Sequence, residues 1–157
     1  PIVWDADALT LLATHDGILP LKEEDIITPH PGEAARLLEQ HVEFILDEPL
    51  DALSRLHDLC GCCVLLKGAR TLVSDGDATY ISLYGTPALA KGGSGDVLSG
   101  VVLALLGLGM DAFDACCCAV WLHGRAGDMA AEDKGEYGML PSDLVEQLPY
   151  ALRELGV

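Results

Sequence analysis

The feature that most constrains the fold of this chain is the alternation of short apolar segments with longer stretches of helical periodicity. Predicted strands cover residues 2–4, 26–28, 63–67, 71–74 and 79–83. Predicted helices cover residues 8–14, 32–40, 47–59, a stretch from the Gly92–Asp96 loop to about Leu106, residues 112–132, and a last segment opened by Pro141-Ser142-Asp143. This alternation is typical of an α/β layered fold, in which helices flank a central sheet.

Turn and capping residues fit the same pattern. Asp7 and Asp111 are expected to cap the helices that follow them, because an aspartate side chain accepts hydrogen bonds from free amides at a helix start. Gly68 and Asp75-Gly76-Asp77 separate the three consecutive strands in the middle of the chain. No internal repeat or linker interrupts the pattern, so the 157 residues are predicted to belong to one domain.

The charge of the chain excludes one large class of function. Its 25 acidic and 9 basic side chains give a formal net charge of −16. Such a protein repels phosphate backbones and anionic lipids, so we expect neither nucleic acid nor a membrane as a partner. The longest nearly uncharged run, residues 97–110, is shorter than the roughly 18 to 20 residues that span a bilayer. Between Cys60 and Gly100 the charges balance, so a phosphorylated ligand is expected to bind in this window.

The cysteines are interpreted as small buried hydrophobic residues of a reducing compartment. They are Cys60, Cys62, Cys63, Cys116, Cys117 and Cys118. Zinc ligands are usually spaced two to four residues apart, whereas adjacent residues on a helix point in different directions. A metal or redox role is the alternative.

The strongest local signal for chemistry is Gly92-Gly93-Ser94-Gly95-Asp96, directly before an apolar helix. Glycines at a helix start leave backbone amides free, so the amides of Gly93, Ser94 and Gly95 form a candidate anion hole. Asp96 would repel a resting anion but suits a general base beside a transferring phosphoryl group. The alternative is an ordinary turn in which Asp96 caps the helix. The endings of a P-loop and of a dinucleotide fingerprint are both absent.

A second signal, Lys67-Gly68-Ala69-Arg70-Thr71, follows a predicted buried strand. Two cations, a glycine and a hydroxyl suit nucleotide phosphates or a ribose. The alternative is an exposed hairpin with solvated charges.

A third signal is Thr28-Pro29-His30-Pro31-Gly32-Glu33. Two prolines stiffen the exit of the strand and hold His30 in place. Glu33 falls in the first turn of the next helix, where a carboxylate is favoured or can meet a magnesium-bound water. The alternative is a proline-capped turn with favourable helix-end electrostatics.

Three further residues carry weaker signals. Asp5 and Asp7 follow a strand at the place where open α/β sheets bind ligands, although helix capping explains them equally well. His123, inside a predicted helix, is interpreted as a core or surface histidine.

Together and in this order, these signals resemble the NAD(P)H-hydrate dehydratase family, which has a ribokinase-like fold. The matching stretches are Asp5-Ala6-Asp7-Ala8-Leu9, residues 28–33, 67–69 and 85–100, Leu122-His123-Gly124, Ala126-Gly127-Asp128 and Ser142-Asp143-Leu144. The resemblance covers nearly the whole chain. It implies that residues 1–157 are the C-terminal part of a single ribokinase-like domain of this family.

The resemblance implies an enzyme that repairs hydrated NADH and NADPH, with ADP in bacteria or ATP in eukaryotes as co-substrate and Mg²⁺ as cofactor. The hydroxyl of the hydrate would be phosphorylated and then eliminated, because a phosphate ester leaves more easily than hydroxide. Asp96 would take the hydroxyl proton, and the amides of Gly93, Ser94 and Gly95 would hold the developing charge. AMP, phosphate and restored NAD(P)H would follow.

Site residues are implied in the same way. His30 and Asp96 would contact the hydrated nicotinamide nucleotide. The adenine nucleotide would be bound by Lys67, Gly68, Ala69, Arg70, Thr71 and Gly95. Glu33 resembles the acidic end of an Asn-x-x-Glu motif that organises magnesium in ribokinase-like kinases, although His30 stands where that Asn would be. Thr10 stands where the family often has Asn.

The sequence also looks incomplete. It opens on Pro1-Ile2-Val3-Trp4, without an initiator Met and directly on a predicted strand. The resemblance implies that the N-terminal half of the domain is absent, and that the fragment alone is inactive or nearly so. For the natural protein it implies a cytoplasmic location, a tetrameric homo-oligomer and an N-terminal epimerase domain, as in many bacterial relatives.

Two other functions stay open. A small-molecule kinase of the same fold, such as a hydroxymethylpyrimidine kinase, would use Asp96 and the glycine loop equally well. Those kinases resemble the Asn version of the motif more than His30-Pro31-Gly32-Glu33, which argues against this reading. A fragment that binds nucleotide without turnover is the second alternative.

Overall fold

The predicted apolar segments form one sheet in the computed structural model of the chain. The structure describes residues 1–15 and 19–156. The strands are β1 (Val3–Trp4), β2 (Ile26–Ile27), β3 (Cys63–Leu66), β4 (Leu72–Ser74) and β5 (Thr79–Ile81), and they lie in this order across the sheet. β1, β2 and β3 run parallel, whereas β3, β4 and β5 are antiparallel neighbours. The mixed sheet with its helices confirms the predicted α/β layered class.

Side chains of β1, β2, β3 and β4 alternate between two hydrophobic cores, whereas Thr79 and Ile81 of the edge strand β5 are exposed. Ile27 and Val64 pack in the core on one face of the sheet, and their neighbours Ile26 and Cys63 pack in the core on the other. This period of two is the geometry of a strand that is covered on both faces. It explains why the strands read as continuous apolar runs.

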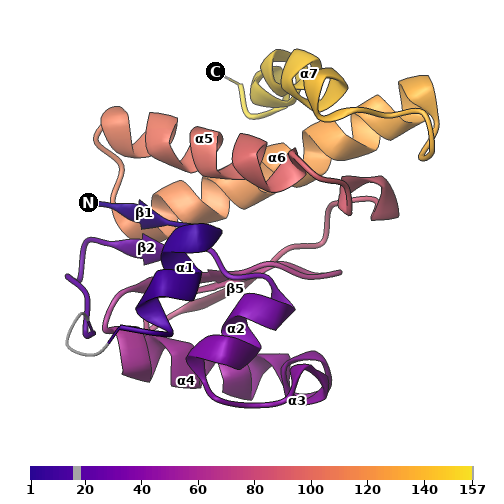
Figure 1. Cartoon of the computed structure of the whole chain (residues 1–157). Coiled ribbons are helices and arrows are strands. Elements are labelled where there is room, and N and C mark those ends of the chain that lie inside the picture. The colour runs from indigo at the N-terminus through magenta and orange to yellow at the C-terminus, as the bar shows by residue number, and fades with distance from the viewer. Residues whose placement is uncertain (16–18, 157) are drawn as a thin grey trace.

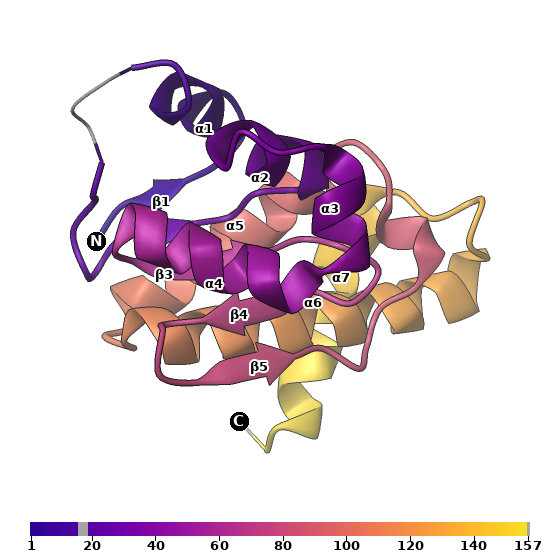
Figure 2. The ribbon, with the colours of Figure 1, turned by 90° about the horizontal axis from the view of Figure 1, so that it is seen from below.

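Helices cover both faces of this sheet (Figure 1). Those on the lower face are α1 (Asp7–Leu12), α2 (Pro31–Leu37), α3 (Val42–Asp47) and α4 (Pro49–Cys60). Figure 2 shows this face, with α4 lying along β3 and β4. α5 (Ser94–Gly107) and α6 (Ala112–Lys134) cover the upper face, and α7 (Pro141–Glu154) packs on α6. A short 3-10 helix, η1 (Pro87–Leu89), lies between β5 and α5. None of the helices in the described residues is long and apolar enough to cross a membrane.

The two predicted aspartate caps have different outcomes. The Asp111 side chain accepts a hydrogen bond from the Asp114 amide at 2.9 Å, which confirms it as the cap of α6. The prediction for Asp7 is wrong. Asp7 is the first residue of α1, and the preceding Ala6 is the N-cap without a side-chain hydrogen bond. The acidic Asp7 is still favoured in the first turn by the helix dipole.

The predicted helix over residues 47–59 is wrong at its start. α3 ends at Asp47, and a new helix, α4, begins at Pro49. Proline lacks an amide hydrogen and has a helical φ, so it favours the first position of a helix over its interior. The opening of α7 at Pro141 follows the same rule and confirms the prediction.

The cysteines behave largely as predicted. All are free thiols; four are buried and two, Cys117 and Cys118, are half-buried. Burial raises the pKa of the Cys60 thiol to about 12, which keeps it protonated and unreactive. Within residues 1–15 and 19–156, no three His, Cys, Asp or Glu side chains come together as a metal site.

Candidate functional site

The carboxyl ends of the three parallel strands meet at one edge of the sheet, and each end carries a residue that the sequence singles out. Asp5 follows β1, His30 lies just beyond β2, and Lys67 follows β3. The Lys67 amide donates to the Pro29 carbonyl at 2.8 Å, which joins the last two strand ends. Open α/β sheets bind their ligands at this edge.

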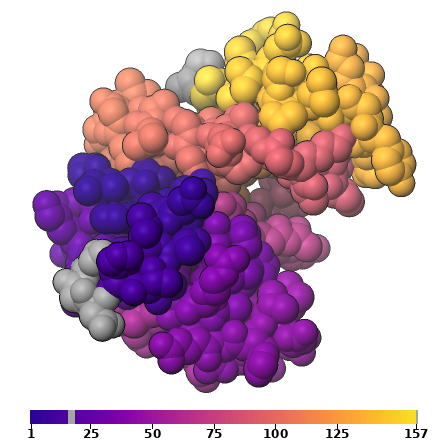
Figure 3. Space-filling model, viewed as in Figure 1, coloured from indigo at the N-terminus to yellow at the C-terminus, as the bar shows by residue number. Residues whose placement is uncertain are grey.

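A cavity of about 870 Å³ lies at this edge, between the exits of β2 and β3 and the start of α5. Figure 3 shows the molecular surface hollowed between the purple lower layer and the salmon upper one. The predicted site residues that line the cavity are His30, Lys67, Gly68, Ala69, Thr71, Ser94 and Gly95. The structure therefore brings the three sequence motifs together around one space.

Four predicted site residues lie outside this lining. Arg70 and Asp96 are exposed next to it, Arg70 on the β3–β4 connection and Asp96 in the first turn of α5. Gly93 precedes α5 as its N-cap. Glu33 is buried in the first turn of α2, below His30.

The sequence analysis assigns no site role to part of the wall. The chain after β5 supplies Ser82, Tyr84, Gly85, Thr86, Pro87, Leu89, Ala90 and Lys91, and α6 supplies Val120, His123 and Gly124. Gly124 offers one usable signal, since a Cβ there would lie 2.9 Å from the Tyr84 carbonyl oxygen. Only glycine lets α6 come this close, and the aliphatic Leu89, Leu98 and Val120 make this side of the cavity apolar.

The start of α5 exposes the backbone amides expected of an anion site. Gly93 has a φ of 96°, and a Cβ there would also lie 3.0 Å from Pro141 Cγ, so this position requires glycine. Within the described residues, the amides of Gly93, Gly95 and Asp96 donate to no protein acceptor, whereas the Ser94 amide donates to the Lys91 carbonyl at 3.2 Å. Of the predicted anion hole, the Gly93 and Gly95 amides are therefore available to an anion, together with that of Asp96.

Ser94 and His123 fix the floor of the cavity. His123 Nε2 lies 2.9 Å from the Ser94 carbonyl oxygen, so this nitrogen must carry the proton and donate it. Burial lowers the pKa of His123, against the opposing effect of that hydrogen bond, and keeps the ring neutral. Ser94 is only 2% exposed, and its hydroxyl has no partner among the described residues. The predicted core histidine is thus buried, but in the wall of the site.

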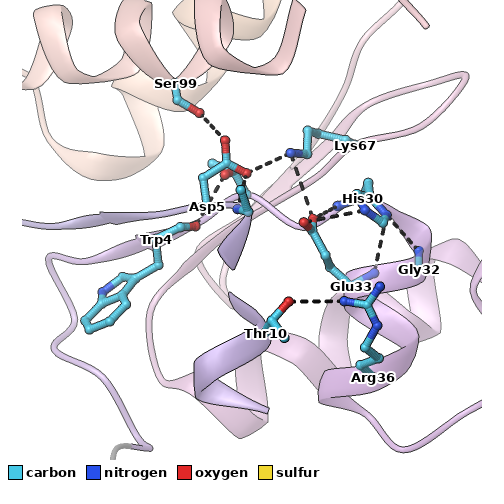
Figure 4. A network of polar contacts seen from close by, with 11 residues as sticks. Trp4, Asp5, Thr10, His30, Gly32, Glu33, Arg36, Lys67 and Ser99 are labelled. Carbon is cyan, nitrogen blue, oxygen red and sulfur yellow. Dashed lines mark hydrogen bonds and ion pairs between the residues drawn. The ribbon is translucent and has the colours of Figure 1, made fainter. Parts of the chain in front are cut away.

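Asp5 and Lys67 form the best-connected ion pair at the site (Figure 4). Lys67 Nζ lies 2.8 Å from Asp5 Oδ1, and the Ser99 hydroxyl of α5 donates to Asp5 Oδ2 at 2.7 Å. Burial raises the pKa of the Asp5 carboxyl, but the hydrogen bonds from Lys67 and Ser99 outweigh it and hold that pKa below its usual value. Asp5 is therefore charged at neutral pH and keeps Lys67 in place.

His30 and Glu33 form a capping box at the start of α2. His30 Nδ1 accepts hydrogen bonds from the amides of Gly32 and Glu33 at 3.0 and 3.3 Å. In return, Glu33 Oε2 accepts from the His30 amide at 2.8 Å. Because Nδ1 is an acceptor, the neutral ring carries its proton on Nε2. This Nε2 lies 3.5 Å from Glu33 Oε1, so the nitrogen faces the Glu33 carboxylate, and the half-exposed ring lines the cavity beside it.

The geometry of Glu33 bears on magnesium. Its side chain is 8% exposed, and its Oε2 accepts the His30 amide and lies 4.0 Å from Lys67 Nζ. Mg²⁺ keeps several waters and is usually held by one or two carboxylates plus the phosphates of a substrate. These contacts do not fit direct coordination by Glu33; they fit an ion carried by phosphate oxygens. Magnesium at Glu33 stays a prediction.

Lys91 lines the cavity, but its ammonium group is engaged in hydrogen bonds to backbone carbonyls. Its ammonium donates to the carbonyls of Glu136, Tyr137 and Met139 at 2.9, 3.1 and 2.6 Å. These bonds tie the segment before the glycine loop to the connection between α6 and α7. Lys67 is therefore the cation that faces the start of α5, with its Nζ 3.7 Å from the position of a Cβ on Gly95.

The arrangement suits a ligand that has both an anionic group and a flat apolar part. Lys67 and the amides of α5 supply positive potential for the anion. The aliphatic side chains of the opposite wall supply a surface for a ring. Asp96 is exposed in the first turn of α5 and supplies a carboxylate at the start of this helix.

Comparisons of sequence agree with this chemistry. A sequence profile described as NAD(P)H-hydrate dehydratase matches residues 1–150. A bifunctional NAD(P)H-hydrate repair enzyme, Nnr, of Vibrio cholerae is 46% identical over 155 residues, which are 99% of this chain and 30% of that protein. An ADP-dependent (S)-NAD(P)H-hydrate dehydratase of Neisseria meningitidis is 41% identical over 139 residues, which are 86% of this chain and 47% of that protein. The chain thus spans less than half the length of either relative.

Comparisons of structure agree as well. An ADP/ATP-dependent NAD(P)H-hydrate dehydratase of Bacillus subtilis, co-crystallised with ATP/Mg²⁺, superposes with a TM-score of 0.88 at 29% identity, over 98% of this chain and 55% of that one. A ribokinase-like superfamily protein of Enterococcus faecalis gives a TM-score of 0.81 at 28% identity, over 97% of this chain and 52% of that one. With the profile match across residues 1–150, these likenesses show that the chain belongs to the NAD(P)H-hydrate dehydratase family and has its ribokinase-like α/β fold.

Proposed function

We propose that the enzyme to which this chain belongs removes water from hydrated NADH and NADPH and uses ADP or ATP as the phosphoryl donor. The observation that carries the proposal is the meeting of His30, Lys67 and Gly95 in the lining of one cavity with an apolar wall, with Asp96 directly after Gly95 in the first turn of α5. The printed names of the Neisseria and Bacillus relatives support the same activity.

The adenine nucleotide is assigned to the cavity itself. Its phosphates would lie between the Lys67 ammonium and the amides of Gly95 and Asp96, since Lys67 Nζ lies 3.7 Å from the position of a Cβ on Gly95 and both amides lack a protein acceptor among the described residues. Gly68, Ala69 and Thr71 line the approach to Lys67, and Arg70 is exposed beside them. The apolar wall suits the base. A magnesium ion bound to the phosphates would offset part of their charge.

The hydrated nicotinamide nucleotide is assigned to the side of His30 and Asp96. As the substrate hydroxyl oxygen bonds to the terminal phosphorus of ADP, Asp96 accepts the hydroxyl proton. The bond from that phosphorus to its bridging oxygen breaks, and AMP leaves with the electron pair. The C–O bond of the new phosphate ester then breaks, and inorganic phosphate leaves with the bonding electrons. The adjacent carbon loses a proton, and the electrons of that C–H bond restore the double bond. The half-exposed side chain of His30 would contact the substrate from the cavity lining.

The domain organisation, the assembly and the cellular location of the natural protein are also proposals. Residues 1–157 would form the C-terminal part of one dehydratase domain, because they cover 47% of the Neisseria enzyme. The bifunctional relative, of which 30% is covered, supports an additional epimerase domain in the natural protein. A tetrameric assembly and a cytoplasmic location are proposed on the resemblance alone.

An assay of the full-length protein tests the function. The protein is incubated with hydrated NADH and ADP, then with ATP, and then with a panel of alcohols that includes hydroxymethylpyrimidine. The proposal expects AMP and NADH to appear in equal amounts with ADP. A phosphorylated alcohol formed without restoration of NADH would overturn it in favour of a small-molecule kinase.

The same assay applied to residues 1–157 alone tests the domain assignment. We expect this piece to turn over little or no hydrated NADH. Calorimetry would show whether it still binds ADP. Full turnover by the piece alone would contradict the proposal that the rest of the domain is required.

A further inference from the structure

We infer that Asp5 is a positioning residue, which holds the Lys67 ammonium against the start of α5 so that it meets the phosphate that is transferred. The inference rests on the proposed function in one respect, namely that Lys67 and the start of α5 face the nucleotide phosphates. Asp5 itself lies outside the cavity lining. It would act through Lys67 and not by contact with the substrate.

Asp5 joins three elements that meet at the site (Figure 4). Its Oδ1 accepts hydrogen bonds from Lys67 Nζ at the end of β3, at 2.8 Å, and from the Ala6 amide at 2.9 Å. Its Oδ2 accepts from the Ser99 hydroxyl on α5 at 2.7 Å. With both oxygens engaged, the carboxylate has one orientation. Strand β3 and helix α5 are thereby fixed relative to each other at the point where the cavity lies between them.

The Asp5–Lys67 ion pair is largely shielded from water, which strengthens the contact. The side chains of Asp5 and Lys67 are 18% and 21% exposed, whereas the ion pair of Asp51 and Arg55 on α4 is about half exposed on both sides. Exposed pairs contribute little and are screened by salt. A sheltered pair with further hydrogen bonds holds its geometry.

Lys67 is oriented by Asp5 more strongly than by any other acid near it. Glu33 Oε2 lies 4.0 Å from Lys67 Nζ and is engaged by the His30 amide. Without Asp5, the flexible lysine side chain would lose its short contact and move among several rotamers. A phosphate would then meet a cation whose position is not set in advance, at a cost in rate.

The backbone conformation of Ala6, next to Asp5, also supports a functional role for Asp5. Ala6 has a φ of 51° and a ψ of −119°, a conformation that residues with a side chain rarely adopt. It lies between the end of β1 and the start of α1 and donates its amide to the Asp5 carboxylate. Strained backbone persists at functional sites, where the surrounding contacts maintain it. Here it places Asp5 at the strand end.

A double-mutant cycle in the full-length protein tests the inference, with Asp5→Asn, Lys67→Met, the double variant and Asp7→Asn. Asp7 is the matched control, because it is the same residue type two positions away and exposed. The readouts are kcat/KM for ADP in the dehydration of hydrated NADH, the Kd for ADP from calorimetry, and Tm. We expect Asp5→Asn to lower kcat/KM at least tenfold, and Asp7→Asn to change it less than twofold.

The decisive comparison is the effect of Asp5→Asn when Lys67 is already Met. If Asp5 acts through Lys67, the loss shrinks to less than threefold in that background. An equal loss in both backgrounds, or no loss in the wild-type background, would overturn the inference. A general structural role predicts the equal loss, together with a matching fall in Tm.

A second variant replaces Asp5→Asn if that protein does not fold. Ser99→Ala removes only the bond from Asp5 to α5, and it is expected to lower kcat/KM at least threefold with Tm retained. No loss of kcat/KM would overturn the inference.

The outcome is separable from that of the proposed function. If the wild type binds ADP but does not dehydrate hydrated NADH, the function fails, and the same cycle measured on the Kd for ADP decides the role of Asp5. If the wild type neither turns over nor binds ADP, both proposals are overturned.

Discussion

Helices α4 and α6 cover opposite faces of the sheet and stabilise it in different ways. α4 buries the large side chains of Leu53 and Leu56, whereas the buried face of α6 consists mainly of alanine, glycine and cysteine. Small side chains bury less apolar area but allow a close approach. α6 uses this at Gly124, against the chain that lines the cavity. The lower layer thus supplies hydrophobic stability, and the upper layer shapes the site.

The largest expected effect on stability tests the lower layer. Leu56 is fully buried, so Leu56→Ala should reduce the free energy of unfolding by about 2–5 kcal/mol through lost burial and a cavity. Denaturant unfolding measures this. Leu50→Ala on the same helix is the control, since Leu50 is 55% exposed, and it should change the free energy by no more than about 0.5 kcal/mol. Because α4 does not line the cavity, kcat of the folded Leu56→Ala protein should stay at the wild-type value; a large fall would break the division between the layers.

A smaller effect on the free energy of unfolding tests the upper layer, and the control substitution is expected to change this free energy in the opposite direction. Gly124→Ala places a methyl group 2.9 Å from the Tyr84 carbonyl oxygen, and we expect it to cost about 1–3 kcal/mol and to raise the KM for ADP. Gly100→Ala in α5 meets no atom within 4 Å and should stabilise the protein by about 0.5–1 kcal/mol, since alanine favours helices. Equal effects of the two substitutions would show that the close approach of α6 is unimportant.

The smallest expected effect is a pH dependence at His123. Its folded-state pKa is lowered from 6.5 by burial, so the unfolded chain takes up the proton first as the pH falls. The free energy of unfolding should therefore decrease below pH 6.5, by at most about 1.4 kcal/mol per pH unit, and stay constant above it for this group. The slope should be smaller in His123→Gln by the contribution of this group. Identical slopes in the two proteins would place His123 outside the buried wall.

The sequence predicts the sheet well because each strand is an apolar run bounded by glycine, proline or aspartate. It misses α3, because the six residues of Val42–Asp47 lie between the predicted helices and are too few to show a helical period of their own. The predicted helix over residues 47–59 corresponds to α4, which begins at Pro49.

For the site, the sequence identifies motifs but not their connections. The Asp5–Lys67 pair joins residues 62 positions apart, which no local pattern can reveal. The same holds for His123 and Ser94, which come together because α6 crosses the start of α5. Tyr84 enters the wall only because Gly124 leaves it room. These contacts depend on tertiary packing, so they appear only in the structure.

The role proposed for Asp96, to accept the proton of the substrate hydroxyl, can be tested with one pair of variants. Asp96 and Asp114 are both exposed aspartates at the third position of a helix, in α5 and α6 respectively. In the full-length protein, Asp96→Asn should lower kcat for hydrated NADH by about 100- to 10,000-fold and leave the Kd for ADP within threefold of the wild type. Asp114→Asn should leave both unchanged. Retention of kcat within tenfold by Asp96→Asn would show that Asp96 is not the proton acceptor.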